Sequence, residues 1–177
     1  MRPASRAGLG VALAVGLTLA AAAAPAAART SGKESFRGQI IAPAKSGTRH
    51  VVSTIVVAKG VFRGDGKLVE VENRPGHPDN VTRDDLVFPQ GTIHIRNTSR
   101  GAPEFTVDPQ TCAVTGRVKQ TIKIQGGTRK FRHASGTLSG QVRGWSVAAR
   151  NPDGSCNQQA DALLEADAFS AQGTMSF

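Results

Sequence analysis

The stretch from Thr121 to Gly140 reads Thr-Ile-Lys-Ile-Gln-Gly-Gly-Thr-Arg-Lys-Phe-Arg-His-Ala-Ser-Gly-Thr-Leu-Ser-Gly, and it decides the fold. It begins as an alternating strand, stops at the pair Gly126 and Gly127, and is followed by a second strand pattern. Glycine adopts positive φ at little cost, so the pair predicts that the chain reverses here. Phe131 is the one large apolar residue in the link, and we expect it to plug the end of a sheet or barrel.

The same stretch carries a family signature. The residues that match it are Ile124, Gly126-Gly127-Thr128, Lys130-Phe131, Ala134 and Gly136. They resemble the Ile-x-Gly-Gly-Thr-Gly-Lys-Phe-x-x-Ala-x-Gly signature of the dirigent and allene oxide cyclase superfamily. Two further phrases, Asp85–Thr92 and Asp108–Cys112, resemble its secreted actinobacterial members. Arg129 departs from the signature, which has a third glycine there, and arginine tolerates positive φ poorly.

Outward from this turn, alternating segments rich in β-branched residues predict about eight strands. The clearest hairpin joins Val51–Phe62 to Lys67–Glu72 through a tight turn at Gly64-Asp65-Gly66. Asn73–Arg83 and Thr98–Asp108 are polar and predict loops. Frequent turns without a clear helix argue for an antiparallel sandwich or barrel, and the pattern alone does not choose between them.

The resemblance makes that choice, because it implies an all-β fold with an eight-stranded antiparallel β-barrel. The last segment, Gln158–Phe177, is ambiguous, since Ala160–Phe169 has the helical composition of alanine, leucine and glutamate. We interpret this segment as a strand, because the superfamily closes its barrel with a C-terminal strand.

Residues 1–28 are organised as a secretory signal peptide. Arg2 and Arg6 precede the uncharged apolar run Leu9–Ala24, and Ala26-Ala27-Ala28 provides a cleavage site. A retained membrane anchor is the alternative, but the run is short, alanine-rich and ends in small residues. We therefore expect an exported, extracellular protein with a flexible N-terminal arm over residues 29–47, within which Phe36–Ile41 could form a short edge strand, and one barrel domain over residues 48–177. No second apolar run is long enough to span a bilayer.

Both cysteines, Cys112 and Cys156, lie in the exported part. An even count in an oxidising compartment favours one disulfide, and a pair of reactive thiols is the alternative. The hairpin between them starts and finishes at the same end of the barrel, so the two sulfurs can meet there.

The net charge of +9 comes from basic residues scattered as singles and pairs. Such a surface attracts polyanions, and an anionic cell-envelope polymer is the partner that it predicts. Nucleic-acid binding requires a clustered patch with stacking aromatics, and a chain with no tyrosine and one tryptophan argues against it.

Residue spacing excludes several kinds of catalytic site. The four histidines lack metal-site spacing and the cysteines form no Cys-x-x-Cys pair, so we expect no metal or cofactor. No serine occupies a Gly-x-Ser-x-Gly elbow. Asp84 and Asp85 could form a rim acid pair, in which like charges raise one pKa, but a solvated turn is the favoured interpretation.

Three residues are candidates for ligand contact in a barrel. Glu70 is the acid that we first expect to face the lumen, although Glu70 and Glu72 could equally point outward. Trp145 fits either the core or a stacking wall, with the core favoured. Phe131 completes the set, and the sequence identifies no catalytic residue.

The function that the resemblance implies is binding or orienting a small apolar molecule in the barrel mouth, without strong intrinsic catalysis. Its members include plant cyclases, dirigent proteins that orient radicals, and bacterial barrels that fold polyketides. The alternatives are a cyclase or isomerase of a secreted apolar metabolite, or a structural envelope protein with a filled barrel. A solid lumen would favour the structural protein, and an open cavity with a buried carboxylate or arginine would favour the cyclase.

Overall fold

The computed structural model describes residues 29–177 except 46–47, 50, 52, 74 and 161. The predicted signal peptide over residues 1–28 lies outside the described residues. The elements are β1 (Ser31–Lys45), β2 (Thr48–Arg49), β3 (Ser53–Gly60), β4 (Arg63–Val71), β5 (Val81–Phe88), β6 (Gly91–Val107), β7 (Ala113–Gly127), the 3-10 turn η1 (Arg129–Phe131), β8 (Ser135–Val147), β9 (Ala149–Arg150), β10 (Cys156–Asn157) and β11 (Leu164–Ser176).

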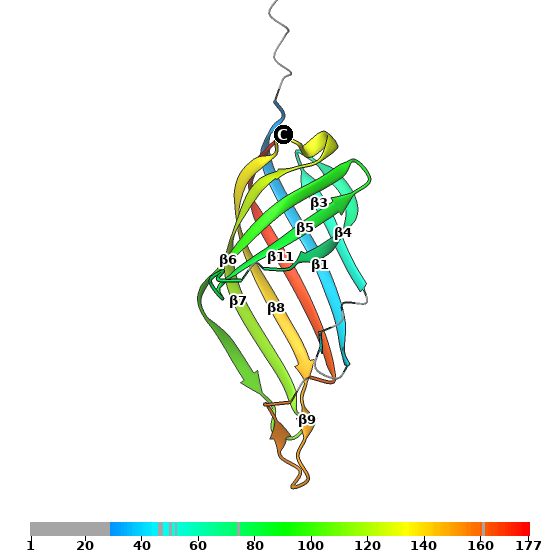
Figure 1. The fold of residues 1–177 in the computed structure, drawn as a ribbon, viewed down its shortest axis with the longest axis vertical. Helices are drawn as coiled ribbons and strands as arrows, with labels where there is room; N and C mark the ends of the chain where they lie inside the picture. Colours follow the sequence, from blue (N-terminus) through cyan, green and yellow to red (C-terminus); the bar gives the residue numbers. More distant parts are fainter. Residues whose placement is uncertain (1–28, 46–47, 50, 52, 74, 161) are drawn as a thin grey trace, which may run out of the picture.

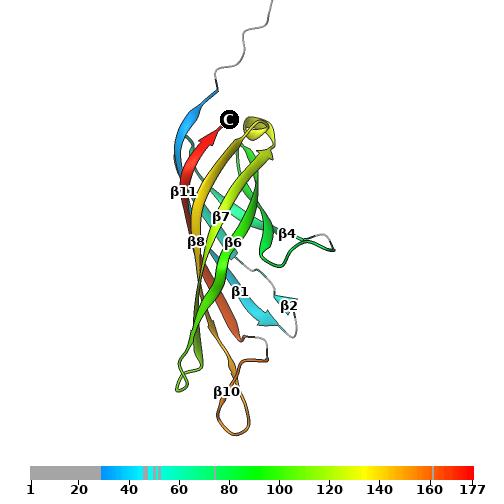
Figure 2. The same cartoon turned by 90° about the vertical axis from the view of Figure 1, so that its left-hand side faces the viewer.

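Eight antiparallel strands close into a barrel, which confirms the predicted fold class. The strands follow the order β11-β8-β7-β6-β5-β4-β3-β1, and β1 pairs back with β11 to close the cylinder. Figure 1 shows η1 and the C-terminus at one end of this barrel and β9 at the other. In both views β6, β7 and β8 continue beyond the cylinder toward the tip that carries β9 and β10 (Figure 2).

The prediction of a flexible arm over residues 29–47 is wrong for most of its length. Ser31–Lys45 forms β1, which pairs with β11 on one side and β3 on the other. Phe36, Ile40 and Ala42 alternate along it and are buried in the barrel core. Gly38 is surrounded so closely that a Cβ there would lie 2.2 Å from the Ile55 carbonyl oxygen. Gly38 therefore serves close packing, although the composition of this segment is typical of a linker.

Two predicted loops and one predicted turn are also corrected. Thr98–Asp108 is largely strand, because β6 runs on to Val107 with a register shift between Arg100 and Glu104. β5 begins at Val81, inside the predicted loop Asn73–Arg83. The first hairpin turns at residues 61–62, and Gly64-Asp65-Gly66 lies within β4.

The C-terminal segment is a strand, as we expected. β11 pairs with β8 from Leu164↔Val147 to Ser176↔Ser135 and with β1 on its other edge. Contacts with β8 limit the size of the side chains in part of this strand. At Gly173, for example, a Cβ would lie 2.2 Å from the Thr137 carbonyl oxygen.

One end of the barrel is closed by the aromatic plug, which we define as Phe62, Phe88, Phe131 and Phe177. Phe131 is the centre of the plug and is completely buried. Its ring centroid lies 4.9 Å from that of Phe62, 5.5 Å from that of Phe177 and 6.1 Å from that of Phe88, all edge to face. Aromatic pairs at these separations and angles are favourable beyond their buried area.

The turn next to the plug needs glycine at both Gly126 and Gly127, but for two different reasons, backbone conformation at the first and close packing at the second. Gly126 has a φ of +98°, the left-handed conformation that glycine adopts most easily. Gly127 has no positive φ, but a Cβ there would lie 2.0 Å from the Thr92 carbonyl oxygen. Thr128 completes the link to β6, because its Oγ1 accepts a hydrogen bond from the Thr92 N–H at 3.0 Å.

Arg129, the departure from the signature, has a φ of +49°. We expect Arg129→Gly to raise the unfolding free energy by about 0.5–1 kcal/mol, because relief of the left-handed strain outweighs the entropy that glycine loses. Arg132→Gly is the matched control, since Arg132 is also exposed but has a φ of −50°. Urea denaturation should show that Arg132→Gly is slightly less stable than the parent. If Arg129→Gly lost a similar amount of unfolding free energy, the backbone at Arg129 would not be strained.

Candidate functional site

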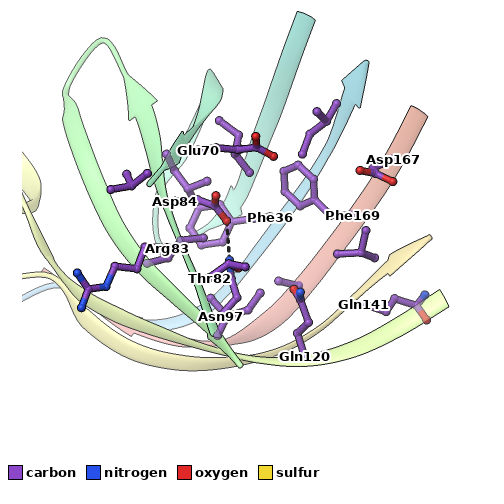
Figure 3. Close-up of a pocket in the computed structure, with 18 of the residues that line it drawn as sticks. Phe36, Glu70, Thr82, Arg83, Asp84, Asn97, Gln120, Gln141, Asp167 and Phe169 are labelled. Atoms are coloured by element: carbon purple, nitrogen blue, oxygen red, sulfur yellow. Dashed lines mark hydrogen bonds between the residues drawn. The ribbon is translucent and has the colours of Figure 1, made fainter. Parts of the chain in front are cut away.

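The barrel interior beyond the plug contains a cavity of about 410 Å³. Side chains from β1, β4, β5, β6, β7, β8 and β11 line it (Figure 3). Glu70, Val71, Glu72 and Asn73 are exposed and form its mouth, at the end of β4 away from the plug. We call this space the cavity.

The wall of the cavity is mainly apolar. Its apolar members are Phe36, Ile40, Leu68, Val71, Leu86, Ile95, Ile122, Val142, Phe169 and Ala171. Most of them alternate with outward residues along their strands, so the barrel pleat points them to the inside. A small apolar molecule that entered this space would lose its contact with water and gain contacts with these side chains.

Three hydrogen-bonded polar side chains, from the neighbouring strands β5 and β6, interrupt this apolar wall. Thr82 is directly opposite Asn97 in the strand register, and Asp84 lies on the same face of β5. The Asn97 Nδ2 donates hydrogen bonds to Asp84 Oδ2 at 2.5 Å and to Thr82 Oγ1 at 3.1 Å (Figure 3). Both partner oxygens accept from the amide nitrogen, so the NH2 side of the Asn97 amide faces Thr82 and Asp84.

Asn97 is unusual because it is buried and only partly satisfied. Its side chain is 5% exposed, and its Oδ1 has no hydrogen-bond partner among the described residues. Buried polar atoms without a partner are rare in folded proteins, and each one calls for an explanation. The Oδ1 atom has almost no accessible surface, so a molecule in the cavity does not reach it while the Asn97 side chain keeps this position.

The charges around the cavity are mostly negative. Among its described lining residues the charged side chains are Glu70, Glu72, Asp84, Asp167 and Arg83. The Arg83 guanidinium is hydrogen-bonded to His77 Nε2 at 2.9 Å, and it points away from the other labelled side chains in Figure 3. Carboxylates therefore outnumber cationic groups among the described residues that line the cavity.

The three predicted ligand-contact residues occupy three different places. Glu70 lies at the cavity mouth. Phe131 lies in the plug and does not line the cavity. Trp145 is 42% exposed and lies in β8 beside a shallow outer hollow that includes Glu104 and Arg117. The structure therefore brings only Glu70 of this set to the cavity.

Asp84 and Asp85 do not form an acid pair or a solvated turn. They are neighbours in β5, so their side chains leave opposite faces of the strand. Asp84 is on the cavity side, whereas Asp85 Oδ1 contacts His94 Nδ1 at 2.6 Å. Asn97 was missed by the sequence analysis, although it continues the inward alternation of Ile93 and Ile95 by one further step.

A second carboxylate, Glu34, is buried outside the cavity. It is 2% exposed, and its Oε2 accepts the Phe62 N–H at 2.9 Å while Oε1 accepts the Ser35 N–H at 3.0 Å. Burial raises the pKa of the Glu34 carboxyl above its ordinary value, and these backbone hydrogen bonds oppose the rise. Glu34 therefore links β1 to the turn between β3 and β4 through the Phe62 N–H. Burial of its ionised carboxylate lowers the free energy of unfolding, because the charge loses its hydration.

This raised pKa makes a prediction about stability and pH. Between the ordinary value of 4.5 and the raised native value, the folded protein binds more protons than the unfolded chain, so stability falls as the pH rises. Glu34→Gln should lack this fall, and its stability relative to the parent should improve as the pH rises from 4.5.

The control for this measurement is Glu104→Gln. Arg117 lowers the pKa of Glu104 through a hydrogen bond and its charge, so that contribution is lost as the pH falls. Urea denaturation from pH 4 to 7 should therefore give opposite pH trends for the two variants. A pH-independent difference between Glu34→Gln and the parent would contradict the role of Glu34.

The described residues contain no group of three or more histidine, cysteine, aspartate or glutamate side chains placed to hold a metal ion. Within the same part of the chain, no helix has the length and apolar character needed to cross a membrane. A disulfide joins Cys112 and Cys156, whose Cα atoms are 5.4 Å apart. The predicted cysteine pairing is thus confirmed.

Comparison with known proteins yields no relative. No family model matches the chain. No curated protein and no solved structure is significantly similar to it either. Its function must therefore be inferred from the cavity and from the chemistry of the residues around it.

Proposed function

We propose that this protein binds a small, largely apolar molecule in the cavity and orients it by the shape of the barrel. The observation that carries the proposal is an apolar-walled space of about 410 Å³ inside a closed barrel. Binding sites for small molecules have volumes of roughly 300–1,000 Å³, with apolar walls and a few placed polar groups. The plug closes one end, so a ligand enters past the mouth at Glu70.

The sequence resemblance to the dirigent and allene oxide cyclase superfamily supports this proposal. Members of that superfamily act on apolar molecules largely by shape and preorganisation. An eight-stranded barrel is the fold that the resemblance implies, although a shared fold does not establish an activity. We further propose that the protein is exported, because the leader-like residues 1–28 and a disulfide agree with an oxidising compartment.

A cyclase or isomerase is the second candidate, and Asp84 is the observation that favours it. Its carboxylate lies on the cavity side and is oriented by Asn97. A positioned carboxylate can transfer protons to or from a bound molecule.

Binding of an anionic cell-envelope polymer is a separate proposal for the outer surface of the barrel. This binding would weaken with added salt, which shortens the Debye length to about 8 Å at physiological ionic strength.

Cavity binding can be tested with the fluorescent probe N-phenyl-1-naphthylamine and a matched pair of variants. Ala171→Leu adds volume at a buried residue that lines the cavity. Ala168→Leu makes the same change at an exposed residue of the same strand. We expect saturable binding by the parent and Ala168→Leu, and at least tenfold weaker binding by Ala171→Leu.

The same protein, purified from culture supernatant, should be examined by native mass spectrometry for a bound small molecule. Absence of saturable probe binding, or equal binding by the two leucine variants, would contradict a ligand site in the cavity.

A further inference from the structure

The outer face of the neighbouring strands β6, β7 and β8 is strongly basic (Figure 1). Glu104 is the one acidic residue in these three strands. Their lysines and arginines alternate with residues that face the barrel interior, so they point outward. They are scattered along the sequence, and strand register brings them together. We call this set the basic face, which comprises Arg96, Arg100, Arg117, Lys119, Lys123 and Arg143.

Strand register also places these cations directly opposite one another. The cross-strand pairs are Arg96 with Lys123, Arg100 with Lys119, and Arg117 with Arg143. Like charges that lie directly opposite in a sheet are destabilising. Glu104, the one carboxylate of these strands, contacts Arg117 at 2.7 Å and so offsets the repulsion at one pair. The free protein therefore carries a repulsion that a bound polyanion would relieve.

Two shallow hollows lie next to each other on this surface. The Lys119 hollow contains two cations and several hydroxyl and amide side chains, which are Arg37, Lys119, Ser35, Ser139, Gln141, Ser170 and Gln172. The Trp145 hollow contains Glu104, Thr106, Thr115, Arg117, Arg143 and Trp145. Ser139 and Trp145 are six residues apart in β8, so the two hollows together extend over about 20 Å. This length suits a linear polymer better than a small ion.

We propose that the basic face binds an acidic polysaccharide, a linear chain of sugar units that carry carboxylates. The carboxylates accept hydrogen bonds from the arginines and lysines, which bind such groups through charge-assisted contacts. Sugar hydroxyls exchange hydrogen bonds with the serine and glutamine side chains of the Lys119 hollow, and one sugar ring stacks on Trp145. This inference rests on the proposed envelope interaction, and it specifies the surface and the class of polymer.

The composition of the two hollows favours this polymer over other polyanions. A single-stranded nucleic acid is held by successive bases stacked on aromatic side chains, and Trp145 is the one aromatic residue that lines either hollow. Inorganic polyphosphate has no ring to stack on Trp145 and would contact mainly the cations. An acidic polysaccharide uses the cations, the hydroxyl and amide groups, and Trp145 together.

Trp145 provides a direct measurement of this contact. It is the only tryptophan, and the chain has no tyrosine, so fluorescence excited in the indole band reports on this one site. The protein is titrated with polygalacturonate, neutral pullulan, inorganic polyphosphate and a thymidine oligonucleotide at physiological ionic strength, with the anionic polymers matched for number of charges. We expect polygalacturonate to bind most tightly and to protect Trp145 from quenching by acrylamide, and pullulan not to bind.

Two double variants then assign binding to the basic face. Lys119→Gln with Arg143→Gln removes two charges from it, and should weaken polygalacturonate binding about tenfold. Lys67→Gln with Arg63→Gln is the matched control, and should change the affinity less than twofold. It removes the same two charges from exposed residues of β4, which three strands separate from β8 in either direction around the barrel. Unchanged circular dichroism shows that each variant is folded.

A third variant separates stacking from charge. Trp145→Ala leaves every cation of the basic face in place. Isothermal titration calorimetry should show weaker binding of polygalacturonate by this variant and an unchanged affinity for polyphosphate. An unchanged affinity for polygalacturonate would overturn the contact between a sugar ring and Trp145.

The outcomes distinguish this inference from the envelope proposal on which it rests. Equal losses in the two double variants, or full quenching of Trp145 at saturation, would overturn the basic face and leave the envelope interaction intact. Tighter binding of polyphosphate or of the oligonucleotide than of polygalacturonate would overturn the polysaccharide alone. If no anionic polymer binds, both proposals are wrong. The quenching measurement needs no variant, so it tests the inference even if a substitution prevents folding.

Discussion

Replacement of Phe131 by alanine is expected to lower the unfolding free energy by about 3–5 kcal/mol. Phe131 is 0% exposed, and the rings of Phe62, Phe88 and Phe177 surround it. The substitution removes a fully buried ring and leaves a void, because a close-packed interior collapses only partly around a deleted side chain. Both the lost transfer free energy and the void contribute to the loss.

The measurement is urea denaturation of the parent and two alanine variants. Phe105→Ala is the control, since Phe105 is 68% exposed on the extension of β6 and its removal creates no void. We expect the control to change stability by less than about 1 kcal/mol, whereas Phe131→Ala should also lower the melting temperature by about 10 °C. Similar midpoints for the two variants would show that the plug does not stabilise the barrel.

The plug is also the part of the molecule that sequence analysis predicted best. A glycine pair flanked by two alternating segments requires a reversal, and Phe131 is the one large apolar residue available to cover it. Both inferences depend on residues close together in the sequence. They could therefore be made without knowledge of the strands that arrive from elsewhere in the chain.

The strands that were missed owe their conformation to distant partners. Ser31–Lys45 has a linker composition, but each of its edges pairs with another strand, β11 on one side and β3 on the other. Residues 98–107 are polar because much of this part of β6 lies on an exposed extension, where strand pairing rather than burial sets the conformation. Alternation of apolar residues detects burial, so it does not detect this exposed part of β6.

The candidate site was predicted only in part for the same reason. Glu70 could be selected because it alternates with apolar neighbours in its own strand. The contact between Asp84 and Asn97 depends on the register that places Thr82 opposite Asn97 across β5 and β6. A shift of that register by one residue would turn Asp84 or Asn97 away from the other. Strand register thus determines the chemistry of the cavity.

Loss of the disulfide is the second change expected to have a large effect. We expect the double variant Cys112→Ser and Cys156→Ser to lose about 4 kcal/mol of unfolding free energy, from the chain entropy of the loop that the bridge closes. The two cysteines are 44 residues apart in sequence, and that segment contains β7, η1, β8 and β9. In the folded protein, pairing of Ala113 with Val147 already holds the two ends near each other. The bridge therefore acts mainly on the unfolded chain.

This account can be checked by comparing the double variant with the parent under oxidising and reducing conditions. Intact-mass analysis after alkylation should detect no free thiol in the oxidised parent and two thiols after reduction. The reduced parent should then denature at the same urea concentration as the double variant. Because Cys156 lies in β10, at the tip opposite the plug (Figure 2), the double variant should retain cavity binding under native conditions. If the double variant were as stable as the oxidised parent, the bridge would not stabilise the fold by lowering the conformational entropy of the unfolded chain.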